Sequence, residues 1–188
     1  GKKVFCYAMA PFISMRALEQ IKCGPGIMDL PICLISVGVG IGYADSGPTH
    51  YVTEEFACLR SIIGAKIFTC ADTPTARDLA KSFIKKPQFA YVRLDRHALP
   101  SIDVDADYNA FRVIGKASKD KIALVSHGKM VHTCVELARK EPENFFAVDL
   151  IQSKTFPIEL VNILQSVVGV IAVDEQSPSG AIGAAIFE

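Results

Sequence analysis

The strongest constraint on the fold is an alternation that runs the full length of the chain. Short apolar, β-branched runs are followed by segments whose apolar residues recur with the period of a helix. A short run with a helical segment after it indicates a strand and its crossover helix, and repetition of that unit predicts parallel sheets covered by helices. The expected strands are 4–8, 32–37, 66–69, 90–94, 122–126, 146–149 and 168–173.

Helix signals lie between these strands. Residues 14–22 and 53–62 place their apolar positions on one face, which is typical of amphipathic helices. The segment 71–86 is the best marked, because Asp72 or Thr73 can serve as N-cap, a proline stands near the first helical position, and lysines end the segment.

The alternation is interrupted at 96–111, where Pro100 and the aspartates Asp103, Asp105 and Asp107 occur. We therefore predict two domains, residues 1–104 and 105–188, each a parallel-sheet, three-layer α/β domain. A chain of 188 residues is short for two complete domains of this class. The chain starts directly in a strand-like run and stops within a helix-like one, so we expect both domains to be truncated and to expose apolar surface.

Composition excludes several classes of function. Twenty basic residues balance twenty acidic ones, and no basic stripe indicates nucleic-acid binding. The longest apolar runs contain glycine and fall short of the roughly 20 residues of a membrane span. No secretory leader is visible, so we expect a cytoplasmic protein that binds neither membrane nor nucleic acid. The six cysteines form no C-x-x-C pair, which favours reduced packing residues.

The stretch "SVGVGIGYADSGPTH" follows the strand at 32–37. Its glycines are spaced by two, which does not match the dinucleotide-binding pattern, so we interpret it as a loop kept small for close approach to its backbone. The carboxyl ends of parallel strands are where ligands bind. Gly47 and Pro48 force a turn that places His50 at this edge, where an imidazole can donate to a substrate or move a proton. A surface or capping histidine is the alternative.

The same stretch resembles the G-P-T-H loop of the transketolase family, and "THYVTEEFACLRSI" resembles the related deoxyxylulose-phosphate synthases. Upstream, "APFISMRALEQIK" is similar to a helix of the pyrimidine-binding domain in split transketolases. "CADTPTARDLAK" and "YVRLDRHALP" resemble later parts of that domain. "KIALVSHGKMVHTCVELA", "FFAVDLIQSKTFPIE" and "VIAVDEQSPSGAIGAAI" resemble the C-terminal domain of the family. The resemblance covers essentially the whole chain in order.

This resemblance implies thiamine diphosphate as cofactor, with Mg²⁺ or Ca²⁺, and transfer of a two-carbon ketol unit between sugar phosphates, as in the pentose phosphate pathway. By position, His50 resembles the histidine that hydrogen-bonds the ketol oxygens of the substrate. Phe12 stands where an aromatic residue stacks on the aminopyrimidine, with an ordinary core phenylalanine as the alternative. Met9 and Met15 occupy flanking positions that are often aromatic in transketolases.

Substrate contacts follow from the same resemblance. Arg96 resembles an arginine that holds a sugar phosphate, and a solvated arginine at a strand end is the alternative. Ser46 stands where transketolases commonly carry an aspartate that contacts a sugar hydroxyl, and Asp45 is one residue away. Arg16 and Arg60 match phosphate-linked arginines of the synthases, although Arg60 also suits a cation at a helix end.

Two parts of the family's site have no counterpart in the sequence. The glutamate that activates the cofactor would precede Gly1, and nothing resembles the Gly-Asp-Gly motif that binds metal and diphosphate. Glu19, Glu54 and Glu55 do not match the glutamate. The chain should therefore be inactive alone, hold no metal, and work with a diphosphate-binding domain or subunit in a homodimer or heterotetramer.

Other assignments remain open at this point. A deoxyxylulose-phosphate synthase, a 2-oxo-acid dehydrogenase β-type chain and a non-catalytic regulatory module of the same fold are the alternatives. For His97, His127 and His132 a structural role is favoured.

Overall fold

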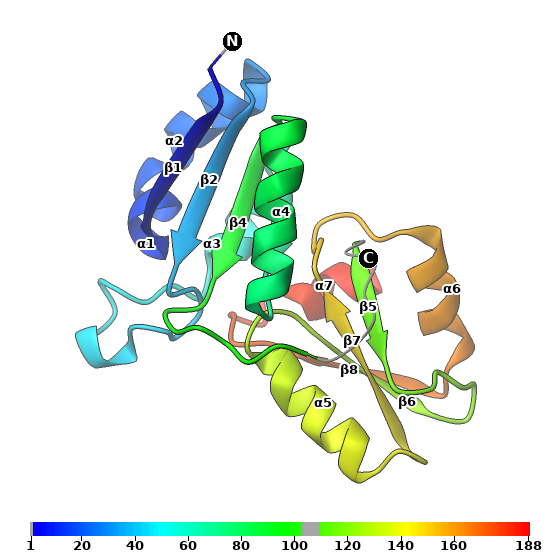
Figure 1. Cartoon of the computed structure of the whole chain (residues 1–188). Helices are drawn as coiled ribbons and strands as arrows, with labels where there is room; N and C mark the ends of the chain where they lie inside the picture. Colours follow the sequence, from blue (N-terminus) through cyan, green and yellow to red (C-terminus); the bar gives the residue numbers. More distant parts are fainter. Residues whose placement is uncertain (1, 103–109) are drawn as a thin grey trace.

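The chain forms two four-stranded sheets, and the computed structural model describes residues 2–102 and 110–188 (Figure 1). The first sheet is parallel throughout. In spatial order its strands are β1 (Val4–Met9), β2 (Ile32–Val37), β4 (Ala90–Leu94) and β3 (Lys66–Thr69). Those of the second sheet are β5 (Phe111–Ile114), β7 (Phe145–Leu150), β6 (Ile122–Ser126) and β8 (Gly169–Val173). The predicted domain boundary at 104/105 lies outside the described residues.

The predicted parallel α/β architecture is confirmed, with one departure. Strand β5 runs antiparallel to β7 at the edge of the second sheet. The apolar pattern does not predict this strand, because Arg112 interrupts a run of only four residues. A charged residue in so short a run weakens any strand signal.

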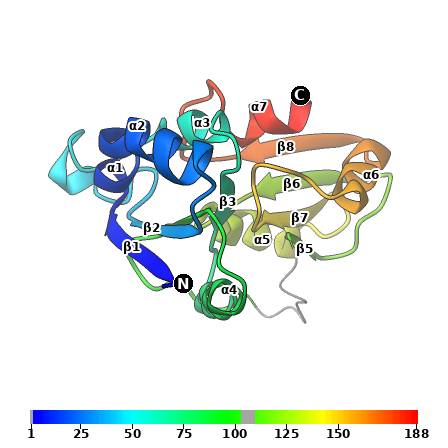
Figure 2. The ribbon, with the colours of Figure 1, turned by 90° about the horizontal axis from the view of Figure 1, so that it is seen from above.

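Helices cover both faces of the first sheet, as Figure 2 shows. Helix α4 (Thr73–Lys85) lies on one face, and α1 (Ala10–Ile13), α2 (Leu18–Ile21) and α3 (Glu55–Arg60) lie on the other. Successive side chains of a strand point to opposite faces of the sheet, so neighbouring residues pack against different helices. Leu34 and Tyr91 pack toward α1–α3, whereas Cys33 and Val92 pack toward α4.

The helix expected at 14–22 is broken into shorter pieces. A 3-10 turn at Met15–Ala17 precedes α2, and a π-helical segment, Lys22–Ile27, follows it. The break begins at Ser14, whose hydroxyl donates to the Ala10 carbonyl at 2.5 Å. Such local side-chain bonds compete with regular helix, which the apolar periodicity does not reveal.

The second sheet is also covered on both faces. Helix α5 (Met130–Lys140) packs on one face through Val131, Cys134 and Val135. Helices α6 (Ile158–Ser166) and α7 (Ile182–Phe187) bury Leu160 and Ile182 on the other. No helix in the described ranges is long and apolar enough to cross a membrane.

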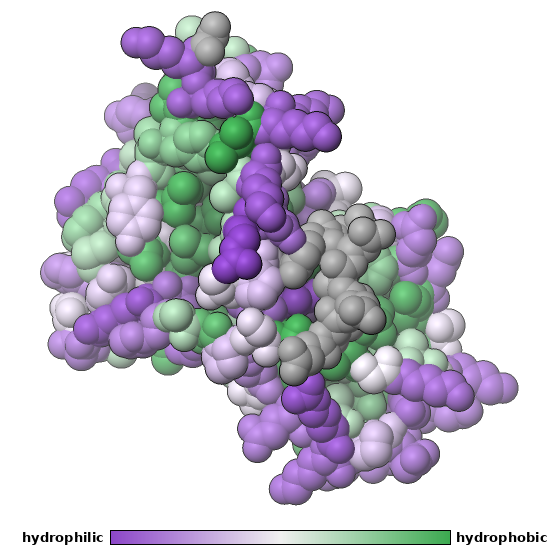
Figure 3. Space-filling model, viewed as in Figure 1, coloured by the Kyte–Doolittle hydropathy of each residue, from purple (hydrophilic) through white to green (hydrophobic). Residues whose placement is uncertain are grey.

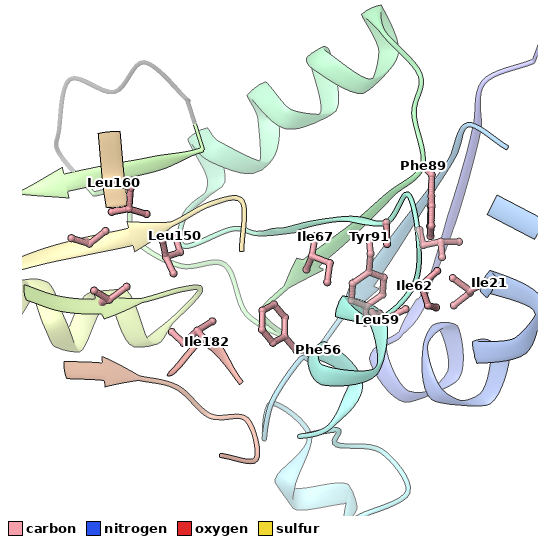
Figure 4. Packing of buried hydrophobic residues seen from close by; sticks show 14 of the residues in the cluster. Ile21, Phe56, Leu59, Ile62, Ile67, Phe89, Tyr91, Leu150, Leu160 and Ile182 are labelled. Carbon is pink, nitrogen blue, oxygen red and sulfur yellow. The ribbon is translucent and has the colours of Figure 1, made fainter. Parts of the chain in front are cut away.

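One apolar cluster joins the two sheets (Figure 4). Phe56 and Ile67 from the first half lie in the same cluster as Leu150, Leu160 and Ile182 from the second, and all five are fully or almost fully buried. Because a packed interior resists sliding, this shared core holds the carboxyl edges of the two sheets in a constant relation.

Some large apolar side chains are exposed. Figure 3 shows an apolar area beside α4, over the strands of the first sheet. Val4, Phe5 and Tyr7 of the edge strand β1 are 42%, 41% and 68% exposed. Surface of this kind is typical of contact regions.

A buried ion cluster also joins the halves. Arg112 on β5 donates to Asp149 Oδ2 at 2.6 Å and 2.9 Å, and to Asp72 Oδ2 at 3.0 Å. Asp72 caps α4 by accepting from the Thr75 amide at 2.9 Å, which confirms one of the two predicted caps. Burial raises the pKa of Asp149 to about 6, although Arg112 opposes the shift. Arg112 therefore neutralises carboxylates from two different segments.

A second buried cluster surrounds Arg93 on β4, which is 1% exposed. Its guanidinium donates to Glu55 Oε1 and to Thr69 Oγ1, both at 3.0 Å. From the second half, His127 lies 3.2 Å from Arg93 Nη1 through Nδ1 and 3.0 Å from Asp174 Oδ1 through Nε2. Burial lowers the pKa of His127, and the adjacent Arg93 lowers it further. Arg93 Nη1 also lies 3.0 Å from His127 Nε2. A neutral imidazole that donates from Nε2 to Asp174 leaves Nδ1 as the acceptor that faces Arg93.

Replacing Arg112 with methionine should lower the free energy of unfolding by about 3–5 kcal/mol, because Asp72 and Asp149 would be buried without a cation. Lys81→Met is the matched control, since it removes an exposed ion pair with Asp78 on α4 and should cost at most about 1 kcal/mol. Urea denaturation measures both. Equal losses in the two variants would show that the buried cluster does not stabilise the fold.

Acidification should destabilise the fold through His127. Below its ordinary pKa of 6.5 the unfolded chain takes up a proton that the folded His127 resists, so this contribution is present above pH 6.5 and is lost as the pH falls. Asp149 has the opposite effect between pH 3.8 and about 6, where its raised pKa makes the folded state more stable as the pH falls. The measurement therefore compares His127→Asn with wild type. The unfolding free energy of the wild type should have the steeper rise with pH, by up to about 1.4 kcal/mol per unit. Parallel curves would contradict the assignment.

Candidate functional site

Three segments meet at the carboxyl edge of the first sheet: the short helical segment after β1 and the loops after β2 and β4. They follow β1, β2 and β4 and cover residues 10–17, 38–54 and 95–101. Because neighbouring parallel strands end at the same edge, segments far apart in the sequence converge there. Figure 1 shows the long 38–54 loop extending from this end of β2 beside α1. This edge carries most of the residues expected to form the site.

The 38–54 loop turns sharply before His50. Gly47 adopts φ 78° and ψ −176°, a conformation that is essentially restricted to glycine. The His50 amide then bonds back to the Gly47 carbonyl at 3.0 Å. Thr49 Oγ1 lies 2.8 Å from His50 Nδ1. If the hydroxyl donates, Nε2 carries the ring proton and is the donor of the side chain.

Phe12 and His50 are in contact. Their ring centroids are 5.6 Å apart with an interplanar angle of 66°, an edge-on arrangement. Arg16 lies over the Phe12 ring at 4.2 Å. Met9 ends β1, and Met15 packs against Ala10, Val39 and Val52, beneath the loop that carries the histidine. Of the predicted cofactor side chains, Phe12 thus contacts His50, and Met15 packs against the loop that carries the histidine.

Arg96 is held by the same loop. Its Nη1 donates to Asp45 Oδ1 at 2.7 Å, and its guanidinium lies 4.7 Å from the centroid of Tyr43. The hydrogen bond from Arg96 lowers the pKa of Asp45. Ser46, the next residue, is exposed. A cavity of about 290 Å³ adjoins Arg96 and His97. Arg96 therefore borders a cavity that Thr73 and Ala76 of α4 also line, with an exposed carboxylate as its partner.

Arg60 is placed elsewhere. Its guanidinium donates to the Gly180 carbonyl at 3.2 Å and to Glu188 at 2.5 Å, both in the second half of the chain. It ends α3, in line with the alternative of a cation at a helix end. None of these contacts includes another predicted site residue.

The glycines before Tyr43 do leave room for close approach, but to other parts of the chain. A Cβ on Gly38 would lie 2.1 Å from the Tyr43 ring. A Cβ on Gly40 would lie 2.9 Å from Glu175 Cβ, in the second half. Glycine at these positions therefore lets the loop fold on itself and pack against the second half.

Sequence reasoning missed the polar cluster behind this loop. Glu55, Arg93, Asp174 and Gln176 were not assigned roles, and His127 was assigned a structural one. A usable signal was present in "AYVRL", since a charged residue within a buried strand requires partners. The pattern alone does not name those partners.

The site has features that suit the flat heterocycle of thiamine diphosphate. Phe12 is half-buried and borders an apolar groove of about 520 Å³ between β1, β2 and the helices above them. An aromatic ring with polarizable methionines nearby is a suitable contact for such a ring. Within 2–102 and 110–188, no cluster of three or more His, Cys, Asp or Glu side chains could hold a metal ion.

Comparisons with known proteins show which family the chain resembles. The family model described as transketolase, pyrimidine binding domain, matches residues 1–101. One subunit of the apulose-4-phosphate transketolase of Phocaeicola vulgatus is 28% identical over 196 residues, covering all of this chain and 62% of that protein. A putative transketolase C-terminal section of Methanocaldococcus jannaschii is 23% identical, with 61% of its length covered. The chain thus spans about three fifths of these curated relatives.

Among solved structures, a split-gene transketolase, described as an inactive beta4 tetramer, superimposes with a TM-score of 0.84 at 24% identity. The match covers 99% of this chain and 62% of that one. At this identity the likeness establishes the fold. The family match extends over more than half of the chain and includes the loops that carry Phe12, His50 and Arg96. The chain belongs to the transketolase pyrimidine-binding family, as its sequence motifs predicted.

Proposed function

We propose that this chain is the pyrimidine-side and substrate-side part of a thiamine-diphosphate-dependent transketolase. The reaction is transfer of a two-carbon ketol unit between sugar phosphates. The observation that carries the proposal is that Phe12 on α1, His50 and Arg96 follow three neighbouring strands at one sheet edge. An aromatic platform, an imidazole donor and a cation suit a heterocycle, a ketol oxygen and a phosphate, respectively.

Bound thiamine diphosphate supplies the electron sink that a ketol transfer requires. Phe12 would support its pyrimidine ring, with Met9 and Met15 filling the space around it. With the Thr49 hydroxyl donating to Nδ1, His50 Nε2 would donate to the ketol oxygens of the donor sugar. An imidazole held in one tautomer is oriented before the substrate arrives, which stabilises developing charge without reorganisation.

The phosphate end of the substrate is assigned to Arg96. A guanidinium binds phosphate through two parallel hydrogen bonds, whereas its bond to Asp45 uses one nitrogen. Asp45 and Ser46 stand where the sugar chain would pass. Arg16, over Phe12, is the second cation within the site.

Activity would require a second component. We assign the metal, the diphosphate and the activating glutamate to a diphosphate-binding domain or subunit, joined in a homodimer or heterotetramer. Two of the similar proteins are described as a subunit of a transketolase and as a split-gene transketolase, which supports a second component. The apolar groove that Phe12 borders is also open beside β1. These 188 residues alone should therefore catalyse no ketol transfer.

The test is ketol transfer from xylulose 5-phosphate by the complete protein assembled with its diphosphate-binding component, thiamine diphosphate and Mg²⁺. His50→Ala should lower kcat/KM by about 10²–10⁴-fold, the range for loss of a positioned donor or acid–base group. His132→Gln is the control, because His132 lies on α5 and bonds to the Ala71 carbonyl. Absence of transfer in the complete assembly would contradict the proposal and favour a regulatory module.

Asp45→Asn should lower the KM for a phosphorylated donor about two- to fivefold, because the neutral amide competes less strongly with phosphate for Arg96. A donor without phosphate should show no such gain. Steady-state kinetics with both donors measures the effect, and Asp78→Asn, which removes an exposed carboxylate on α4, is the control. A rise in KM would instead show that Asp45 itself contacts the sugar.

A further inference from the structure

A segment of the second half reaches the loop that carries His50. Residues 174–180 leave β8 and lie against residues 40–57 of the first half. Gln176, at the centre of this contact, is 8% exposed. A buried amide needs partners for two donor hydrogens and one carbonyl oxygen.

All of these partners belong to the first half. With its nitrogen toward the carboxylate, the Gln176 amide donates to Glu55 Oε2 at 2.7 Å and to the Thr53 carbonyl at 3.0 Å, and its oxygen accepts from Arg93 Nη2 at 2.9 Å. The opposite orientation would leave only a 3.4 Å contact to the Val52 carbonyl. Hydrogen-bond chemistry therefore selects the first orientation.

Backbone contacts strengthen the attachment. The Ser177 amide donates to the Thr53 carbonyl at 2.7 Å, so that one carbonyl accepts from two residues of the second half. The Val52 amide bonds to Gly40, whose missing Cβ leaves room for Glu175. The two ends of the loop, near Gly40 and near Val52, are thus fixed to the second half. Val52 is separated from His50 by one residue.

Gln176 is itself held in place. The backbone N–H of Gln176 donates to Asp174 Oδ1 at 3.2 Å, and the same oxygen lies 3.0 Å from His127 Nε2. The charged groups of this cluster are the cation Arg93 and the anions Glu55 and Asp174, and the adjacent Glu175 is paired with Lys129 at 2.7 Å. Every one of these groups is fixed by another member of the cluster, so the position of Gln176 is set before any ligand binds.

We propose that Gln176 is a positioning residue that orients His50 by anchoring the base of its loop to the second half of the chain. This role rests on the proposed function of His50, because Gln176 touches no predicted cofactor or substrate group. The C-terminal half would thus contribute to the reaction geometry, although the residues assigned to the chemistry come from the first half.

The test uses Gln176→Met in the complete assembly, because methionine has similar length and no hydrogen-bonding amide. Hydrogen exchange of the peptides within residues 40–53 should become about five- to tenfold faster. With the donor sugar phosphate, kcat/KM should fall about 10- to 100-fold with a raised KM, since small displacements of a catalytic group are costly. Affinity for thiamine diphosphate should not change.

Ser126→Ala is the matched control. It also removes a hydrogen bond of a buried side chain, from Ser126 Oγ to the Val173 carbonyl at 2.8 Å, but in the second sheet. Exchange within 40–53 and the KM should stay at wild-type values. If Gln176→Met behaves like this control, or merely lowers the amount of folded enzyme at unchanged KM, the positioning role is overturned.

A double-mutant cycle with His50→Ala isolates the role. If Gln176 acts through His50, Gln176→Met should cause little further loss of kcat/KM once the imidazole is gone. Fully additive losses would overturn the proposal. Lack of ketol transfer by the wild type would contradict the proposed function instead, and the exchange measurement would still report on the anchoring of the loop.

Discussion

The structure depends on the burial of the Arg93 guanidinium. A cation with 1% exposure must be neutralised and hydrogen-bonded, or its desolvation would cost several kcal/mol. Glu55 and Thr69 supply part of the requirement from the first half, and His127 and Gln176 supply the rest from the second. Separating the halves would leave this charge only partly satisfied, so the polar cluster specifies how they fit together.

The apolar core and the polar clusters make different contributions. The apolar cluster that contains Phe56 joins the sheets and favours folding, but apolar contact is non-directional and tolerates small shifts. Hydrogen bonds and ion pairs tolerate them poorly, because distance and angle are restricted. The clusters of Arg93 and Arg112 therefore set the register between the sheets. Glu55 links this register to the site, since it lies five residues after His50.

The candidate site also combines non-directional apolar contacts with directional polar ones. Phe12, Met9 and Met15 offer apolar, adaptable contacts, whereas His50 and Arg96 need defined directions. His50 is oriented by Thr49 and by the turn at Gly47, and its loop is held at the base by residues 175–177. Arg96 is held by Asp45, a partner that a phosphate can displace. The loop is thus held by buried contacts near His50. The contact that a ligand can replace, between Arg96 and Asp45, lies where the phosphate of the substrate is proposed to bind.

Local sequence determined the strands and the best helix. The predicted bounds of β2, β3, β4 and β6 match those observed, and Asp72 caps α4, because side-chain alternation and capping depend on neighbouring residues. The G-P-T-H loop and its collinear segments also identified the family. Tertiary structure alone decided the antiparallel β5, the placement of Arg60 and the partners of Arg93. Gln176 and Glu55 are 121 positions apart, and no local pattern encodes a hydrogen bond between them. Such contacts exist only once packing has brought the two halves together.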